Sequence, residues 1–364
     1  SNINNLKYDN SFLLAALLFF NAHFFYIAPV KIYFDSNPDI GIIIKALLLL
    51  TLFFLALRNA SILKKHLIFL TLIGISFSLI IFTKDNLLNV AAPIILGLAL
   101  YRTDIPSFLN RYFVITNIFW LIYLIIFVFF YNFITKFDAY TIERIGIENT
   151  EVTLRAGLGF ISPNNIGSVV CTAAIIACLV KREGIAIIYL LFAFLTFLYT
   201  DSRSILISTI LIFLFIAFNS FFNKTKSINL LVYYGLILVL VLLALLTFFG
   251  VLDQLTQIDR ILSHRLHYLH LILVPSIFGT IGVHALDTSL MDLLNKGGML
   301  AFSAYVYASH IVMKLNRSAS ILVVGFLLLG LSENIINQYN ILGPLIFLFY
   351  FRSKTNLYTK EEFH

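Results

Sequence analysis

Charged residues are scarce in this chain. They make up 12% of its 364 residues, whereas 60% are hydrophobic and the mean hydropathy is +0.95. A water-soluble domain carries roughly a quarter of its residues as Asp, Glu, Lys and Arg. The shortage excludes a soluble globular protein, and the lack of any long polar stretch excludes a hidden soluble domain. We therefore expect an all-α, polytopic integral membrane protein that forms a single domain over residues 1–364.

Other absences narrow the chemistry. Cys171 and Cys178, the two cysteines, lie seven apart in one apolar run, so they face the same side of a helix about two turns apart and cannot bond to each other. No His, Cys or carboxylate cluster has metal-ligand spacing, and there is no phosphate-binding loop of the Walker or dinucleotide type. The net charge of +7 is not gathered in a soluble basic cluster. We expect no metal, no cofactor and no nucleic acid.

Long apolar runs are what the chain has in abundance. A membrane span needs about 20 apolar residues, and the sequence offers about twelve transmembrane helix candidates. They are residues 11–30, 39–57, 66–82, 87–101, 108–133, 156–180, 184–200, 205–222, 228–252, 289–313, 319–332 and 336–351. The first run, Ser11 to Val30, lacks a small-residue cleavage signal and is predicted to be a retained helix.

Lys and Arg set the orientation. With the N-terminus inside the cell, most of the 25 basic residues fall in cytoplasmic segments, as the positive-inside rule requires. The two termini are then both cytoplasmic. The basic residues left on the outer side are Lys31, Lys84, Lys136, Arg144, Arg155, Arg203, Arg260, Arg265 and Lys296.

Two outer loops exceed turn length, at residues 134–155 and 253–288, and loops this long between packed spans are usually functional or disordered. The second loop is predicted to carry an amphipathic helix. Its apolar residues repeat at spacings of three and four, and its basic stripe holds Arg260, His264 and His267. This helix could lie over the bundle and point cations at it, or it could rest on anionic lipid head groups.

Arg155 stands before an apolar run that is interrupted by Gly157, Gly159 and Pro163. These residues should break the outer end of the helix, with Asn164 and Asn165 satisfying the freed backbone. Irregular backbone at membrane depth survives only where it is buried or lines a wet cavity. The pattern indicates either a simple kink with a snorkelling arginine or a cavity with an arginine at its mouth.

Arg203 repeats this theme one hairpin later. Its turn, Thr200 to Ser204, is too short to hold it far from the hydrocarbon boundary. It could pair locally with Asp201, or its planar guanidinium could bind a phosphate through two parallel hydrogen bonds.

A third group leads into the run at 289–313. His284 and Asp287 are three residues apart, and a histidine beside a carboxylate can accept a proton near neutral pH. Asp292 and Lys296 follow, one helical turn apart, and then the pair Gly297 and Gly298.

The order of these pieces resembles the O-antigen polymerase and ligase superfamily, and within it the Wzy-type polymerases of polysaccharide repeat units. The likeness covers roughly residues 150–310 and rests on these positions: Arg155, Gly157, Pro163, Asn164, Ser202, Arg203, His284, Asp287, Leu293, Leu294, Gly297 and Gly298. The glycine pair is out of register with the ligase-type histidine motif, which favours polymerase over ligase.

The resemblance implies a glycosyltransferase of the bacterial inner membrane that joins oligosaccharide units carried on undecaprenyl diphosphate at the periplasmic face, building O-antigen of lipopolysaccharide or a related surface polysaccharide. Membrane lipids, a chain-length regulator and a flippase are the implied partners. The implied roles are as follows: Arg155, Arg203, Arg260 and Arg265 hold the departing diphosphate, His284 or Asp287 takes the acceptor's proton, and Asn164, Asn165 and Ser202 line the cavity.

A lipid-linked oligosaccharide flippase or other transporter would also have about twelve spans. Transporters often show two related halves, and residues 1–140 contain no counterpart of the segment from Arg155 to Arg203. A purely structural scaffold leaves the outer arginines unexplained. The sequence thus favours an enzyme with one outer site.

Overall fold

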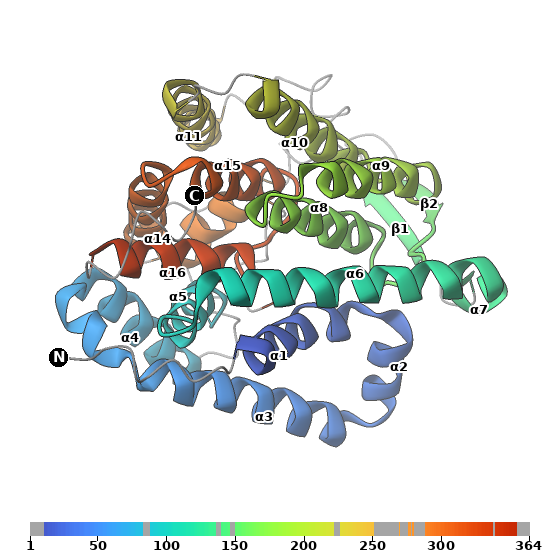
Figure 1. Ribbon diagram of the computed structural model, residues 1–364, viewed down its shortest axis with the longest axis horizontal. Coiled ribbons are helices and arrows are strands. Elements are labelled where there is room, and N and C mark those ends of the chain that lie inside the picture. Colours follow the sequence, from blue (N-terminus) through green and yellow to red (C-terminus); the bar gives the residue numbers. More distant parts are fainter. Residues whose placement is uncertain are drawn as a thin grey trace. The chain divides into compact units, whose positions relative to one another are not determined.

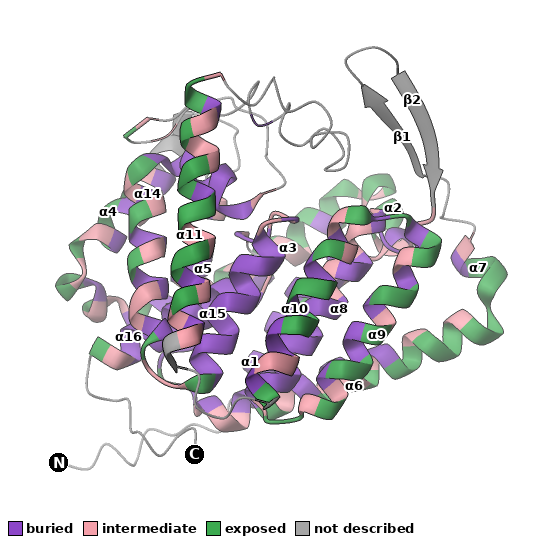
Figure 2. Cartoon of the chain, turned by 90° about the horizontal axis from the view of Figure 1, so that it is seen from above, coloured by how far each residue is buried: buried purple, intermediate pink, exposed green. Residues whose placement is uncertain are grey.

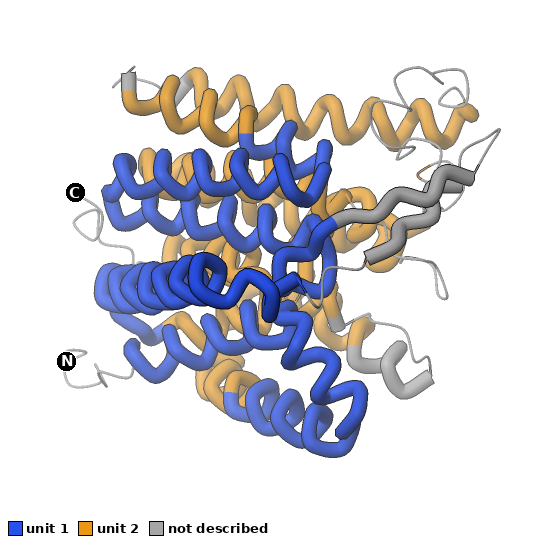
Figure 3. The backbone as a smooth tube through the Cα atoms, turned by 90° about the vertical axis from the view of Figure 1, so that its right-hand side faces the viewer, with its two compact units in different colours: residues 1–51, 102–209 blue, residues 52–101, 210–364 orange. Residues whose placement is uncertain are grey.

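The structure is a computed structural model that describes residues 11–82, 88–135, 140–145, 150–221, 226–250, 269, 276–277, 279, 288–337 and 339–354. The chain divides into two compact units, drawn in two colours in Figure 3. Unit 1 comprises residues 1–51 and 102–209, and unit 2 comprises residues 52–101 and 210–364.

Unit 1 contains several helices and one strand pair (Figure 1). Its elements are α1 (Ser11–His23), η2 (Phe24–Tyr26), α2 (Ala28–Ser36), α6 (Ile105–Phe129), α7 (Tyr131–Thr135), β1 (Tyr140–Ile145), β2 (Thr150–Arg155), α8 (Pro163–Leu179) and α9 (Glu183–Thr200). Helix α1 packs on α6, and α8 packs on both α6 and α9. Two helices, α3 (Pro38–Leu57) and α10 (Arg203–Phe221), have residues in both units.

The regular elements described in unit 2 are all helices. Its elements are η3 (Ala60–Lys65), α4 (Leu67–Phe82), α5 (Leu88–Ala99), α11 (Lys226–Phe248), α14 (Ser289–Met313), α15 (Arg317–Gly330) and α16 (Leu342–Lys354). All but the first residue of α15 are buried, and α16 is buried from Leu342 to Arg352 (Figure 2). Because these helices are apolar all round, they form the core of the unit. Gly97 lets α5 approach α16, since a Cβ there would lie 2.7 Å from the Cβ of Phe347.

In the part of the chain that the structure describes, five helices are long and apolar enough to cross a membrane: Pro38–Leu57, Ile105–Phe129, Glu183–Thr200, Arg203–Ser220 and Ile228–Phe248. In each of these helices, at most 39% of the residues in the most apolar stretch are buried, so most of their apolar surface faces outward. The prediction of a helical chain with helices able to span a membrane is confirmed, whereas the count of about twelve spans stays a prediction. Further apolar helices are shorter, namely Ser11–Tyr26, Leu67–Ser76, Asn89–Ala99, Pro163–Leu179 and Arg317–Gly330.

The prediction of one continuous helix over residues 11–30 is wrong. Helix α1 ends at His23, the 3-10 turn η2 follows, and the extended residue Ile27 then forms an antiparallel bridge with Phe160. The N–H of Ala28 donates to the carbonyl of Gly159 at 2.8 Å, and the N–H of Ile161 donates to the carbonyl of Tyr26 at 2.9 Å. These tertiary bonds outweigh helix continuation, and Pro29 then starts α2 in the opening turn that proline favours.

The loop predicted at residues 134–155 holds the antiparallel hairpin β1–β2, in which Tyr140 pairs with Arg155 and Ile145 with Thr150. Alternation in the segment Thr150 to Arg155 was the available signal. The second predicted loop, 253–288, lies outside the described residues except for Leu269, Ser276, Ile277, Gly279 and Thr288 at its end. Its amphipathic helix therefore stays a prediction.

Candidate functional site

The turn that carries Arg203 lies between α9 and α10 in unit 1. Asp201 closes α9 in the left-handed region, with φ 46° and its N–H donating to the carbonyl of Phe197 at 2.9 Å. The side chains of Arg203 and Asp201 are 49% and 54% exposed, and their nearest charged atoms lie 4.0 Å apart. The predicted local pair thus forms, but such an exposed pair contributes little stability. The guanidinium can turn to another anion at small cost.

The start of α8 lies beside this turn. Ser202, 1% exposed, donates its hydroxyl to the Oδ1 of Asn164 in the first turn of α8. Gly167 allows the approach, because a Cβ there would lie 2.2 Å from the Cγ2 of Ile205. The starts of α8 and α10 are therefore held together, so the positive ends of two helix dipoles lie at this turn, where Arg203 is the first residue of α10.

Sequence reasoning placed Asn164 correctly at a helix break but gave it a different partner. Helix α8 starts at Pro163, and the hydroxyl of Ser162 accepts from the N–H of Asn164 at 3.4 Å. The side chain of Asn164 instead accepts from Ser202. Asn165 lies in the same first turn, half-buried, and its N–H donates to the carbonyl of Ser162.

The other predicted site residues are described in part or not at all. Arg155 ends β2, seven residues before the cap of α8, and only its backbone is described. Arg260, Arg265, His284 and Asp287 lie outside the described residues. Their roles stay predictions.

Unit 2 contains a second polar feature, a break in α14. Gly298 has φ 69° and ψ −171°, a backbone conformation that is not helical. The N–H groups of Met299 and Leu300 donate instead to the carbonyls of Ser276 and Ile277, at 2.8 and 3.2 Å. Glycine is required at this point, since a Cβ on Gly298 would lie 2.3 Å from the backbone nitrogen of Gly279.

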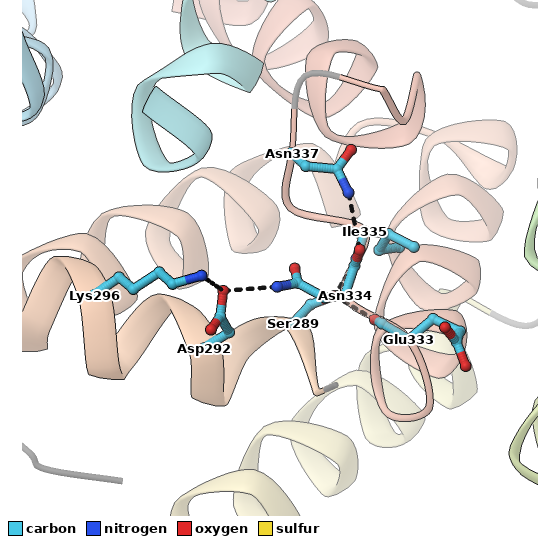
Figure 4. Close-up of polar contacts among 7 residues, drawn as sticks. All are labelled: Ser289, Asp292, Lys296, Glu333, Asn334, Ile335 and Asn337. Carbon is cyan, nitrogen blue, oxygen red and sulfur yellow. Dashed lines mark hydrogen bonds and ion pairs between the residues drawn. The ribbon is translucent and has the colours of Figure 1, made fainter. Parts of the chain in front are cut away.

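A buried ion pair precedes the break (Figure 4). The Nζ of Lys296 lies 2.9 Å from the Oδ2 of Asp292, and the two side chains are only 11% and 4% exposed. The Nδ2 of Asn334 donates to the same Oδ2 at 2.6 Å. We call these three residues the α14 cluster. Lys296 and Asn334 both donate to one carboxylate oxygen of Asp292, so the charges of the cluster are satisfied within it. This arrangement favours a role in positioning α14.

The same face of α14 is fastened to the link between α15 and α16. The hydroxyl of Ser289 donates to the carbonyl of Glu333 at 2.7 Å and accepts from the N–H of Ile335 at 2.8 Å. Thr288 donates to the carbonyl of Leu331 at 3.2 Å. The start of α14 is therefore fixed to residues 331–335 at several points.

Sequence spacing had paired Asp292 with Lys296, but it missed Asn334 and Ser289. No periodic pattern connects positions that are more than 40 residues apart. The only signal was composition, because Ser332, Glu333 and Asn334 interrupt an otherwise apolar region.

Comparison of this chain with protein-family models, with curated proteins and with solved structures found no match.

Proposed function

We propose that the protein is a membrane glycosyltransferase that polymerises oligosaccharide repeat units linked to undecaprenyl diphosphate, producing O-antigen or a related surface polysaccharide at the periplasmic face of the bacterial inner membrane. The observation that carries the proposal is the end of unit 1 at which Arg203 stands beside the starts of α8 and α10. A half-exposed guanidinium and two helix N-termini together favour a phosphate-bearing ligand.

The chemistry needs such a site. The hydroxyl of the acceptor sugar attacks the anomeric carbon of the donor, the bond from that carbon to the diphosphate oxygen breaks, and the hydroxyl proton is lost to a base. The lipid diphosphate departs with additional negative charge. Arg203 and the helix ends stabilise this charge more in the transition state than before it, which lowers the barrier. Arg155, Arg260 and Arg265 would add cations, and His284 or Asp287 would take the proton.

The proposal includes the full topology expected from the sequence. It has about twelve spans, cytoplasmic termini and periplasmic loops at 134–155 and 253–288. The apolar helices and the outward-facing surfaces of the five long ones support a multi-pass arrangement. A flippase and a chain-length regulator would act before and beside the enzyme.

The experiment is a glycan ladder from a host in which the gene is replaced by variants. Arg203→Ala should leave the protein in the membrane but reduce long chains to single repeat units. Arg203→Lys should restore part of the ladder, since lysine keeps the charge but loses the two-pronged geometry. Arg182→Ala, which removes an exposed arginine at the opposite end of α9, is the matched control and should keep the full ladder. A full ladder with Arg203→Ala refutes the proposal.

The α14 break favours a second candidate, a transporter or flippase of lipid-linked oligosaccharide. Ionisable residues within a membrane helix mark transport pathways, and broken helices are common in transporters. Deletion of the gene separates the candidates. Single-unit surface glycan indicates a polymerase, whereas lipid-linked units trapped on the cytoplasmic side indicate a flippase. Accumulated polymer together with absent surface glycan indicates a ligase.

A further inference from the structure

A continuous set of aromatic rings occupies one side of unit 1. It starts at Trp120 on α6, which is 3% exposed, and includes one residue of α7, one of the segment before α8 and two of α9. The members are Trp120, Tyr123, Phe127, Tyr131, Phe160, Phe192 and Tyr199, which we call the aromatic track.

The track runs along the helices. Trp120, Tyr123 and Phe127 follow at three and four residues on α6, so they share one face and span about 10 Å of its length. Ring centroids lie 5.2 Å apart between Trp120 and Tyr123 and 6.2 Å apart between Tyr123 and Phe127. Phe127 then contacts Tyr131 at 5.4 Å and Tyr199 at 6.3 Å.

An ordinary aromatic belt does not explain this arrangement. Belt residues gather at the level of the lipid head groups, with a polar end in water. Trp120 and Phe160 are instead buried, at 3% and 2% exposed, and their rings stack at 6.1 Å. The track thus leads from the interior of unit 1 to the exposed rings of Tyr131 and Tyr199, at 45% and 54%.

The exposed end of the track is close in the chain to Arg203, the residue proposed to bind phosphate. Tyr199 lies in the last turn of α9, and Arg203 follows four residues later as the first residue of α10. An apolar aromatic surface that ends at a half-exposed guanidinium is complementary to a lipid with one long chain and an anionic head. Methyl branches and double bonds along such a chain pack well against ring faces.

We propose that the accessible part of the aromatic track, from Tyr123 and Phe127 to Tyr131 and Tyr199, binds the isoprenoid chain of the lipid diphosphate whose head is held at Arg203, with Trp120 packed behind it. This inference rests on the proposed function only in requiring a lipid diphosphate as substrate, and it assigns the chain-binding surface. The rings fix the chain's direction, so the diphosphate meets Arg203 in one orientation.

Trp120 supplies the measurement, because it is the only tryptophan in the chain. Its Nε1 has no hydrogen-bond partner among the described residues, so its emission responds mainly to packing. The full-length protein in lipid nanodiscs is titrated with undecaprenyl diphosphate, undecaprenol, inorganic pyrophosphate and phosphatidylglycerol. Undecaprenyl diphosphate should change the emission at saturable, low concentrations, and undecaprenol should do so more weakly. Pyrophosphate and phosphatidylglycerol should not.

Two ring deletions on α6 test the surface itself. Phe127→Ala should weaken binding of undecaprenyl diphosphate by about tenfold or more, since a half-buried ring that would contact the chain is lost. Phe129→Ala removes a ring that is 75% exposed on another face of α6 and should leave binding unchanged. Equal effects of the two variants, or an equal response to phosphatidylglycerol, overturn the proposal.

The outcomes separate the two proposals. Arg203→Ala should weaken binding of the diphosphate lipid but not of undecaprenol. If the track binds the lipid while Arg203→Ala keeps a full glycan ladder, the polymerase proposal fails and the chain-binding surface stands. If Arg203→Ala collapses the ladder but Phe127→Ala binds the lipid normally, the polymerase proposal stands and the chain-binding surface is refuted.

Discussion

Neutralising Asp292 alone should destabilise unit 2 far more than neutralising its whole ion pair. With the charged atoms of Asp292 and Lys296 2.9 Å apart, their attraction is about 6 kcal/mol at an effective dielectric constant of about 20. Much of this offsets the loss of hydration on burial. Removing one partner leaves a buried charge uncompensated and costs about 3 to 5 kcal/mol, whereas replacing both can be nearly neutral.

The variants are Asp292→Asn, Lys296→Met and the double substitution. Asparagine keeps an acceptor for Asn334, and methionine keeps the apolar stem, so neither adds a large cavity. We expect each single variant to lose about 3 kcal/mol or more of unfolding free energy and the double variant to lose less than either. Unfolding of the purified protein in mixed micelles, followed by far-UV circular dichroism, gives the free energies.

The exposed pair of Lys31 and Asp35 is a matched control, with the same spacing in sequence, a distance of 2.7 Å and side chains 46% and 64% exposed. Lys31→Met should cost about 0.5 kcal/mol or less. If the double variant at the α14 cluster loses as much as the two single variants together, the pair is not coupled and the reasoning is refuted.

Three further outcomes are expected. Gly298→Ala should unfold or misfold unit 2, because the added Cβ would clash with the backbone of Gly279 and Ile277. The control Gly235→Ala, whose Cβ would have nothing within 4 Å, should be neutral or stabilise by about 1 kcal/mol. Thermal unfolding compares the two variants. Ser202→Ala should cost about 1 kcal/mol in the same assay, and a neutral result would show that its bond to α8 is not stabilising. Asp201→Cys should react with an impermeant maleimide in intact cells and Lys181→Cys only after permeabilisation, and the opposite pattern reverses the orientation.

Hydropathy located the helices well because a helix that is buried or faces lipid requires a long apolar run, and such a run is visible in the sequence. The run predicted at 184–200 is α9 at Glu183–Thr200, and the run at 289–313 coincides with α14. The wrong prediction at residues 11–30 shows the limit. The break at Ile27 is fixed by backbone bonds to residues 159–161, and no local pattern encodes a partner so distant in the chain.

The candidate sites show the same division. The glycine pair before Met299 and the spacing of Asp292 and Lys296 were visible in the sequence, because both are local. The carbonyls of Ser276 and Ile277 that complete the break, and the Asn334 that completes the cluster, come from other segments. Their contributions depend on tertiary packing and could not be predicted from spacing.

The link between α15 and α16 has a consequence for the order of assembly. The side chain of Asn337 accepts from the N–H groups of Tyr339 and Asn340, and the Oδ1 of Asn340 accepts from the N–H of Leu342. These bonds connect residues two or three apart, so the link can take its shape as soon as it leaves the ribosome. Its bonds to α14 join residues more than 40 apart. We therefore expect the α15–α16 hairpin to form first and to act as the template on which α14 docks, which delays burial of Asp292 until its partner is in place.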